Sequence, residues 1–189
     1  PISNLSNSGI DRIQIYVKEK PRTLVSHIGT GRHYNINSKS GRLQILFTDS
    51  DQRNNIYNTD IASYYENMEC IEEMHHPYVV ITPDYMVYTA DFSKLIEQHI
   101  QSEADITLLY HAVDNAKDAY LNCNILNLNK QKGVLSIEPN HGNAKNRNIF
   151  MDTYIMKKDL FIELIRKAKA ISSAFTLADI INELHDELD

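Results

Sequence analysis

The sequence contains only two cysteines, Cys70 and Cys123, and they form no Cys-x-x-Cys motif. Such a low number argues against a disulfide-rich fold and a cysteine-based zinc site, so we expect small buried thiols in a reducing compartment. No apolar run approaches the roughly 18 residues of a membrane-spanning helix, and no signal peptide is visible. We therefore expect a cytoplasmic protein that does not contact a membrane.

Positive charge is also in deficit. The chain has 19 lysines and arginines against 25 aspartates and glutamates, which gives a formal charge of −6. A nucleic-acid-binding domain normally presents a basic face, so we expect no nucleic-acid partner. The length of 189 residues suits one hydrophobic core, and we expect a single domain.

Several enzyme motifs are missing. The only Gly-x-Gly sequence is Gly29–Arg32, which follows an expected helix and therefore lacks the strand–turn–helix geometry of a dinucleotide-binding fingerprint. The chain has no Walker-type phosphate loop, no His-Glu-x-x-His and no Gly-x-Ser-x-Gly. These absences exclude the commonest local signatures of nucleotide, zinc and serine-hydrolase chemistry.

Apolar residues alternate between strand spacing and helix spacing along the first part of the chain. Strands are expected at 12–17, 43–48, 78–82 and 105–111, and helices begin at Pro21 and cover 56–74 and 91–102. This alternation predicts an α/β fold with a mostly parallel mixed sheet flanked by helices. The rest of the chain predicts a hairpin at 122–138, a strand at 149–156, and helices at 159–170 and 177–188. Thr176 precedes the last helix, and its spacing to Asp179 predicts a capping box.

Three carboxylates stand at or near the ends of expected strands. They are Asp84, Glu138 and Asp152. Ligands of open parallel sheets collect at the carboxyl ends of the strands, where acidic side chains can hold Mg²⁺ for phosphoryl or nucleotidyl transfer. The alternative is that each one is a solvated loop acid or a helix cap.

Six segments share their order and spacing with the motifs of one enzyme family. They are PISNLSNSGIDRIQIYV (1–17), YNTDIASYYENM (57–68), YVVITPDYMVYTADF (78–92), HIQSEADITLL (99–109), VLSIEPN (134–140) and FMDTYIM (150–156). Together they resemble the glucose-1-phosphate adenylyltransferase (ADP-glucose pyrophosphorylase) family, which makes ADP-glucose for glycogen or starch. The matching family motifs include Y-R-G-T-A-D, G-D-H-I-Y, E-E-K-P and S-M-G-I-Y.

The resemblance implies a Rossmann-like fold of the nucleotide-diphospho-sugar transferase type, with residues 1–189 forming one nucleotidyltransferase-like domain of a longer protein. It also implies a fold that is incomplete at both ends, because the family's Gly-rich phosphate loop and its C-terminal β-helix domain have no counterpart in this sequence. If the chain is active, the resemblance implies ATP and Mg²⁺ at the site.

Several family positions carry a different residue type here. Glu138 stands where the family has the lysine of E-E-K-P, which meets the phosphate of glucose 1-phosphate. Reversing the charge beside a dianion changes attraction into repulsion. Thr59 replaces the glycine of G-T-A-D, Ala62 replaces its aspartate, and Asp152 replaces the glycine of G-I-Y. These changes converge on one pocket.

The segment after the third expected strand departs from the family as well. Aligned from its left end, Asp84 takes the place of the metal-binding aspartate, with Pro83 where the family has glycine. Aligned from its right end, Asp84 falls on the glycine and Tyr85 on the aspartate. We therefore interpret Asp84 as a pocket position and assign no catalytic residue and no metal ligand. The pocket positions implied by the resemblance are Tyr57, Thr59, Ala62, Asp84, Tyr85, Glu138 and Asp152.

These departures favour a regulatory, non-catalytic subunit of glucose-1-phosphate adenylyltransferase that assembles with a catalytic subunit. The run Met-Asp-Thr-Tyr at 151–154 is similar to that of bacterial regulatory subunits of glycogen synthesis. One alternative is an active sugar-phosphate nucleotidyltransferase that uses Mg²⁺ at Asp84. Another is a module that senses a sugar phosphate or nucleotide without turnover.

Overall fold

The computed structural model describes residues 2–10, 12–17, 21–28, 42–47 and 59–189. The sequence predictions for Gly29–Arg32 and Tyr57 lie outside these residues. In chain order the elements are α1 (Ile2–Asn7), β1 (Arg12–Val17), α2 (Pro21–Ile28), β2 (Arg42–Phe47), α3 (Asp60–Glu66), α4 (Met68–Glu72), β3 (Tyr78–Ile81), α5 (Phe92–Ser102), β4 (Ile106–Val113), β5 (Asn124–Leu128), β6 (Val134–Pro139), β7 (Arg147–Lys157), α6 (Lys158–Ile171) and α7 (Leu177–Glu183).

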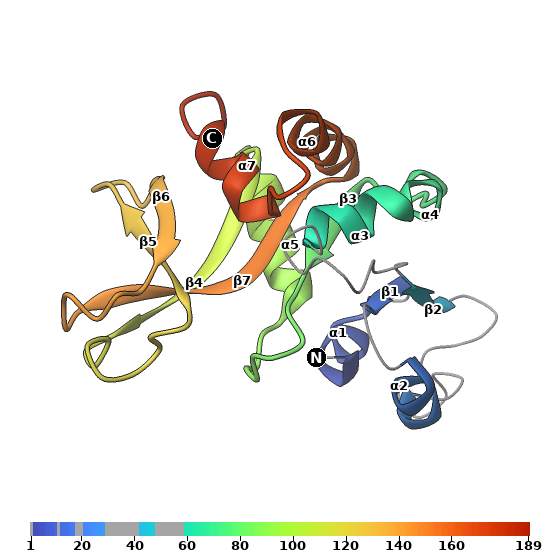
Figure 1. Cartoon of the computed structure of the whole chain (residues 1–189), viewed down its shortest axis with the longest axis horizontal. Coiled ribbons are helices and arrows are strands. Elements are labelled where there is room, and N and C mark those ends of the chain that lie inside the picture. The colour runs from blue at the N-terminus through green and yellow to red at the C-terminus, as the bar shows by residue number, and fades with distance from the viewer. Residues whose placement is uncertain (1, 11, 18–20, 29–41, 48–58) are drawn as a thin grey trace.

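The long strand β7 is the centre of a five-stranded sheet. One of its edges pairs with β4. The other edge pairs with β3 near the C-terminal end of β7 and with β5 near its N-terminal end, and β6 continues the sheet beyond β5. The β5–β6 hairpin therefore extends from one end of β7, while α1, α2 and the β1–β2 pair lie beyond the other end (Figure 1).

The predicted α/β class with a mixed sheet and flanking helices is confirmed, but parallel pairs do not predominate among the described strands. β1 and β2 pair in parallel, whereas β3 and β4 both pair with β7 in the antiparallel sense. β3 and β4 consequently run in the same direction, as a strand–helix–strand unit requires. The interposed β7 separates them, and the local alternation of the sequence gives no sign of this long-range insertion.

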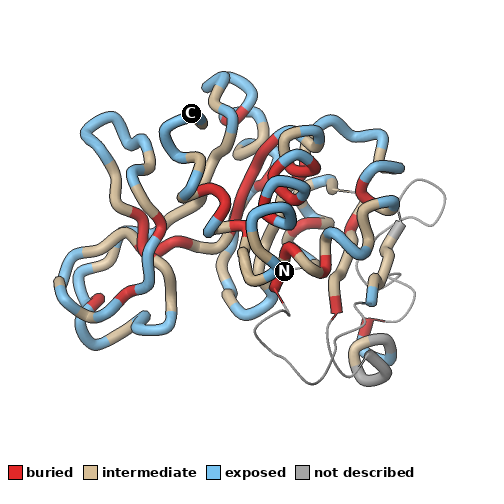
Figure 2. The backbone as a smooth tube through the Cα atoms, turned by 45° about the horizontal axis from the view of Figure 1, so that its top comes forward, coloured by how far each residue is buried: buried red, intermediate tan, exposed pale blue. Residues whose placement is uncertain are grey.

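Helices cover both faces of the sheet around β3 and the second half of β7. Because successive residues of a strand point to opposite faces, Val79 packs with α3, α4, α6 and α7, while Val80 packs with α1 and α5. α6 follows β7 directly and buries one stripe of apolar residues at helical spacing. Figure 2 colours the buried parts of the helices and of the sheet red. That stripe consists of Phe161, Ile162, Leu164, Ile165 and Ala168.

Two predicted helices differ from the observed ones. The described part of the predicted helix 56–74 divides into α3 and α4 at Asn67, whose side-chain amide donates to the carbonyl oxygen of Ser63 at 3.0 Å and so competes with the helical backbone. The predicted helix 177–188 ends at Glu183. The chain then turns, because Leu188 packs against the core and the carbonyl oxygen of Asp189 accepts backbone N–H groups at the start of β4.

The capping box predicted at Thr176 and Asp179 is confirmed. Cys70 and Cys123 are free thiols, and both are partly exposed where we expected buried ones. Within the described ranges, no helix combines the length and the apolar character needed to cross a membrane.

Candidate functional site

A β-bulge interrupts β7 near its middle. Leu108 of β4 pairs with Tyr154, but Tyr110 pairs with Phe150, so three residues of β7 face the single residue between Leu108 and Tyr110. The middle one of the three is Asp152, and its φ of 44° lies in the left-handed region that glycine adopts without strain. The position that the family resemblance assigns to glycine thus has a glycine-type backbone and a carboxylate side chain.

The Asp152 carboxylate is half-buried beside a second acid. Burial, and then the negative charge of Asp60, raise its pKa from 3.8 to about 6. Near neutral pH the two carboxylates repel each other in a site of restricted hydration. This arrangement disfavours an additional anionic group, such as a phosphate, at the same place.

Asp60 is held by the first turn of α3. Its carboxylate accepts the backbone N–H of Ile61 at 2.7 Å and that of Leu177, at the start of α7, at 3.1 Å. The preceding residue, Thr59, is buried and caps α3, because its Oγ1 accepts the N–H of Ala62 at 3.2 Å. Thr59 and Ala62 therefore lie on the helical turn that carries Asp60 toward Asp152.

Two tyrosines, Tyr64 and Tyr154, lie close enough to Asp60 to be affected by its charge. Tyr154, which follows the bulge, is buried and makes an edge-to-face contact with Phe150 at 5.0 Å between centroids. Tyr64 makes the same kind of contact with Tyr16 at 4.9 Å and with Phe161 at 5.0 Å. Burial, and then the charge of Asp60, keep the pKa values of Tyr64 and Tyr154 above their ordinary value. Both phenols therefore stay protonated at neutral pH.

The loop between β3 and α5 joins the bulge from another direction. The Tyr88 hydroxyl of this loop is hydrogen-bonded to the Thr153 hydroxyl, which also donates to the carbonyl oxygen of Met151 at 2.9 Å. Asp84 and Tyr85, from the same loop, are exposed. Their loop is thus attached to the bulge by Tyr88, while their own side chains face solvent.

The described residues do not form a metal centre around Asp84. In the parts of the chain that the structure describes, no three histidine, cysteine, aspartate or glutamate side chains come together in a way that could hold a metal ion. A cavity between this loop and α1 encloses about 10 Å³ and is lined in part by Pro83 and Tyr88. That volume is close to the minimum for a single water molecule.

Glu138 is exposed on β6 and is connected to the same helices through its neighbour. The backbone N–H and C=O of Ile137 are both hydrogen-bonded to the side-chain amide of Asn182 in α7, each at 2.7 Å. α7 in turn begins at Leu177, the residue bound by Asp60. Hydrogen bonds therefore connect Asp60, which lies beside Asp152, to α7, and connect α7 to Ile137, the residue before Glu138.

Three residues of this site were missed by the sequence predictions: Asp60, Tyr88 and Thr153. The Thr59–Asp60 pair before an apolar helix is typical of a helix start, so the cap was predictable from the sequence. The contact of Asp60 with Leu177 joins residues 117 positions apart, and no local pattern signals it.

Comparisons with known proteins agree with this fold. The sequence model of a family described as nucleotidyl transferase matches residues 1–187. The chain is similar to glucose-1-phosphate adenylyltransferase from Clostridium perfringens (strain SM101 / Type A), with 30% identity over 156 residues that cover 82% of this chain and 40% of that protein. The corresponding enzyme from Clostridioides difficile (strain 630) is 25% identical over 169 residues, which cover 89% of this chain and 43% of the enzyme.

This chain thus spans less than half the length of the curated relatives it matches. A solved structure with the same fold is the crystal structure of HddC from Yersinia pseudotuberculosis. It superposes with a TM-score of 0.68 at 14% sequence identity, covering 94% of this chain and 67% of HddC.

Proposed function

Because this chain belongs to the nucleotidyl transferase family, we propose that it is the nucleotidyltransferase-like part of a regulatory, non-catalytic subunit of glucose-1-phosphate adenylyltransferase. The complete enzyme joins ATP and glucose 1-phosphate into ADP-glucose and diphosphate for glycogen synthesis. In this proposal a catalytic partner subunit performs the reaction, and the present chain modulates the partner through subunit contacts.

The observation that carries the proposal is the bulge residue Asp152. Its backbone has the left-handed conformation of a glycine position, and its side chain places a second carboxylate beside Asp60. The path of the strand is therefore retained while the chemistry of the pocket is changed. Such a combination is expected when a domain keeps its fold for assembly and no longer needs to bind an anionic substrate.

Glu138 supports the same conclusion independently. The resemblance implies a lysine that contacts the phosphate of glucose 1-phosphate. This chain has the exposed, negatively charged Glu138 at that position. At contact distance near a protein surface, one unit-charge interaction is worth about 1–4 kcal/mol, so reversing its sign weakens phosphate binding substantially.

The first experiment measures glucose 1-phosphate binding by calorimetry. We expect no saturable binding by the unmodified protein at millimolar ligand, and measurable binding by Glu138→Lys. Glu97→Lys makes the same charge change on the exposed surface of α5 and should not restore binding. Tight binding of ATP or glucose 1-phosphate by the unmodified protein would instead support a sensing module.

The second experiment tests the partner. We expect the protein to co-elute with a catalytic glucose-1-phosphate adenylyltransferase subunit in size-exclusion chromatography and to change that subunit's response to substrates and effectors. Separate elution, together with unchanged kinetics of the catalytic subunit, would refute the regulatory role.

A further inference from the structure

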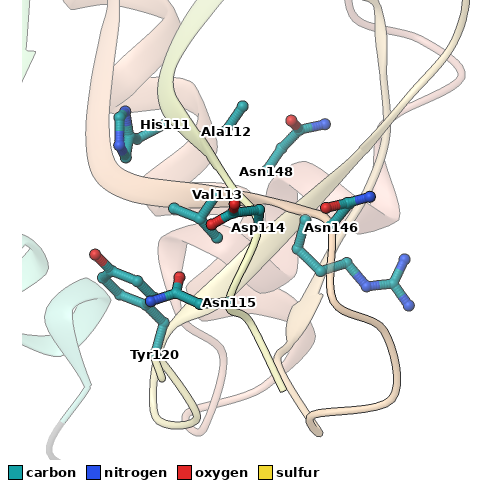
Figure 3. Close-up of a pocket in the computed structure, with 9 residues that line it drawn as sticks. His111, Ala112, Val113, Asp114, Asn115, Tyr120, Asn146 and Asn148 are labelled. Atoms are coloured by element: carbon teal, nitrogen blue, oxygen red, sulfur yellow. The ribbon is translucent and has the colours of Figure 1, made fainter. Parts of the chain in front are cut away.

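A hollow of about 670 Å³ lies at the start of β7, at the opposite end of this strand from α6. Three segments line it: the end of β4, the turn that carries Tyr120, and the beginning of β7 (Figure 3). None of the six described pocket positions implied by the resemblance lines this hollow. Its volume falls within the range of about 300–1,000 Å³ that is typical of small-molecule sites.

The turn that forms one wall is held in place by a buried amide. Asn140 is only 3% exposed, and its Nδ2 donates to the carbonyl oxygens of Ala116 at 2.9 Å, Ala119 at 3.3 Å and Tyr120 at 3.1 Å. Its Oδ1 accepts the N–H of Gly142 at 3.0 Å. Both the nitrogen and the oxygen of this amide are hydrogen-bonded to the backbone around the turn, so a ligand would meet a preformed wall.

Tyr120 is presented to the hollow by a strained backbone. Its φ of 60° is left-handed, which costs about 1–2 kcal/mol for a residue other than glycine. The residue nevertheless remains 44% exposed at the wall of the hollow. Because the strain is not repaid by burial of the ring, it points to a function for the exposed aromatic face.

The remaining lining is rich in amides and balanced in charge. Asn115, Asn146 and Asn148 each offer a hydrogen-bond donor and an acceptor in one planar group. Arg147 and Asp114 carry opposite charges, so neither an anion nor a cation meets a surplus of the complementary sign. A ligand that suits this lining is uncharged and has many groups that both donate and accept hydrogen bonds.

We propose that the hollow binds an uncharged carbohydrate, with one face of a pyranose ring against Tyr120 and the sugar hydroxyls on Asn115, Asn146 and Asn148. The C–H face of a pyranose provides the apolar surface that an exposed aromatic ring can cover, and neighbouring hydroxyls match the paired donor and acceptor of an amide. Asp152 lies four residues beyond Asn148 along β7 and does not line the hollow. The proposed sugar site does not depend on the proposed regulatory role.

In the test, the purified full chain is titrated with maltotriose, cellotriose and mannotriose. Binding is measured by calorimetry and by the NMR chemical shifts of the amides. We expect saturable binding of at least one sugar, with shifts at Asn146 and Asn148. Tyr120→Gly suits the left-handed backbone and should weaken binding at least about tenfold, whereas Tyr120→Phe keeps the ring and should retain it. Asn146→Ala, at an exposed position, should also weaken binding without affecting the fold.

The matched control is Tyr65→Ala, which removes a tyrosine of similar exposure (46%) from α3 and should leave binding unchanged. The proposal is overturned if none of the three sugars saturates at millimolar concentration, or if inorganic phosphate or glucose 1-phosphate displaces the bound sugar. Equal weakening by Tyr65→Ala and Tyr120→Gly would likewise refute it. These outcomes leave the role assigned to Asp152 and Glu138 untouched.

Discussion

The carboxylate of Asp60 accepts the backbone N–H of Leu177 with both oxygens, at 3.1 Å for Oδ1 and 3.3 Å for Oδ2. This contact fastens the start of α7 to the first turn of α3. Burial, and after it the charge of the same carboxylate, raise the pKa of Asp152 in the bulge of β7. One acid thus has a clear structural role, while its neighbour adds repulsion at the position where the family resemblance implies a glycine.

Replacing Asp60 tests the structural role. Asp60→Ala should lower the free energy of unfolding by about 1–2 kcal/mol, because the N–H groups of Ile61 and Leu177 lose their acceptor. Asp60→Asn keeps one acceptor oxygen and should lose clearly less. Urea unfolding followed by circular dichroism measures both values. Equal losses for the two variants would show that the acceptor oxygen is unimportant.

Asp152 predicts a specific dependence of stability on pH. Since its pKa rises from 3.8 to about 6 on folding, the stability it contributes is fully present below pH 3.8 and is lost as the pH rises through about 6. Without solvent screening this loss would be about 3 kcal/mol. Because the carboxylate is partly exposed, screening by solvent reduces the loss to about 1–2 kcal/mol. Asp152→Asn should therefore be more stable than the unmodified protein at pH 7 and equally stable near pH 4.

The backbone of Asp152 predicts a second effect, which is independent of charge. Because φ is 44°, Asp152→Gly should be more stable than Asp152→Ala by about 1 kcal/mol at every pH. Both variants lack the carboxylate, so their difference reports the left-handed conformation alone. If Asp152→Ala is at least as stable as Asp152→Gly in thermal unfolding, the bulge does not have the described geometry in solution.

His99 predicts a loss of stability in mild acid. The ring is buried in α5, and its Nδ1 is hydrogen-bonded to Oγ1 of Thr107 at 2.7 Å. Burial, and then the charge of Lys157, lower the pKa of His99 below 6.5. The folded state thus binds a proton less tightly than the unfolded state, and stability should fall as the pH drops below 6.5.

His99→Gln should flatten this part of the stability profile between pH 7 and pH 5. Thr107→Val removes the hydrogen bond, which should cost about 1 kcal/mol at pH 7 while retaining the slope. An unchanged slope in His99→Gln would assign the acid sensitivity to another group.

Local patterns predicted the elements of this fold better than their arrangement. The apolar spacing of α6 and the Thr176–Asp179 box depend only on residues a few positions apart, and both were predicted correctly. The insertion of β7 between β3 and β4 depends on contacts between distant segments, which no local period encodes.

In the candidate site, too, the local features were predictable from the sequence and the long-range contacts were not. The resemblance indicated that Asp152 occupies a glycine position, and the left-handed φ agrees with that assignment. The burial of this carboxylate and its neighbour Asp60 follow from the packing of α3 and α7 on the sheet, so the sequence alone gave no sign of its raised pKa. The roles of Asp84 and Glu138 stay predictions.

The measurement that tests the account most directly is ADP-glucose formation by the purified full-length protein that contains this chain, assayed alone with ATP, glucose 1-phosphate and Mg²⁺. We predict no turnover above a blank without protein, while a catalytic glucose-1-phosphate adenylyltransferase subunit assayed in parallel forms ADP-glucose. Robust, magnesium-dependent formation of ADP-glucose by the protein alone would contradict the account and identify the chain as part of an active nucleotidyltransferase.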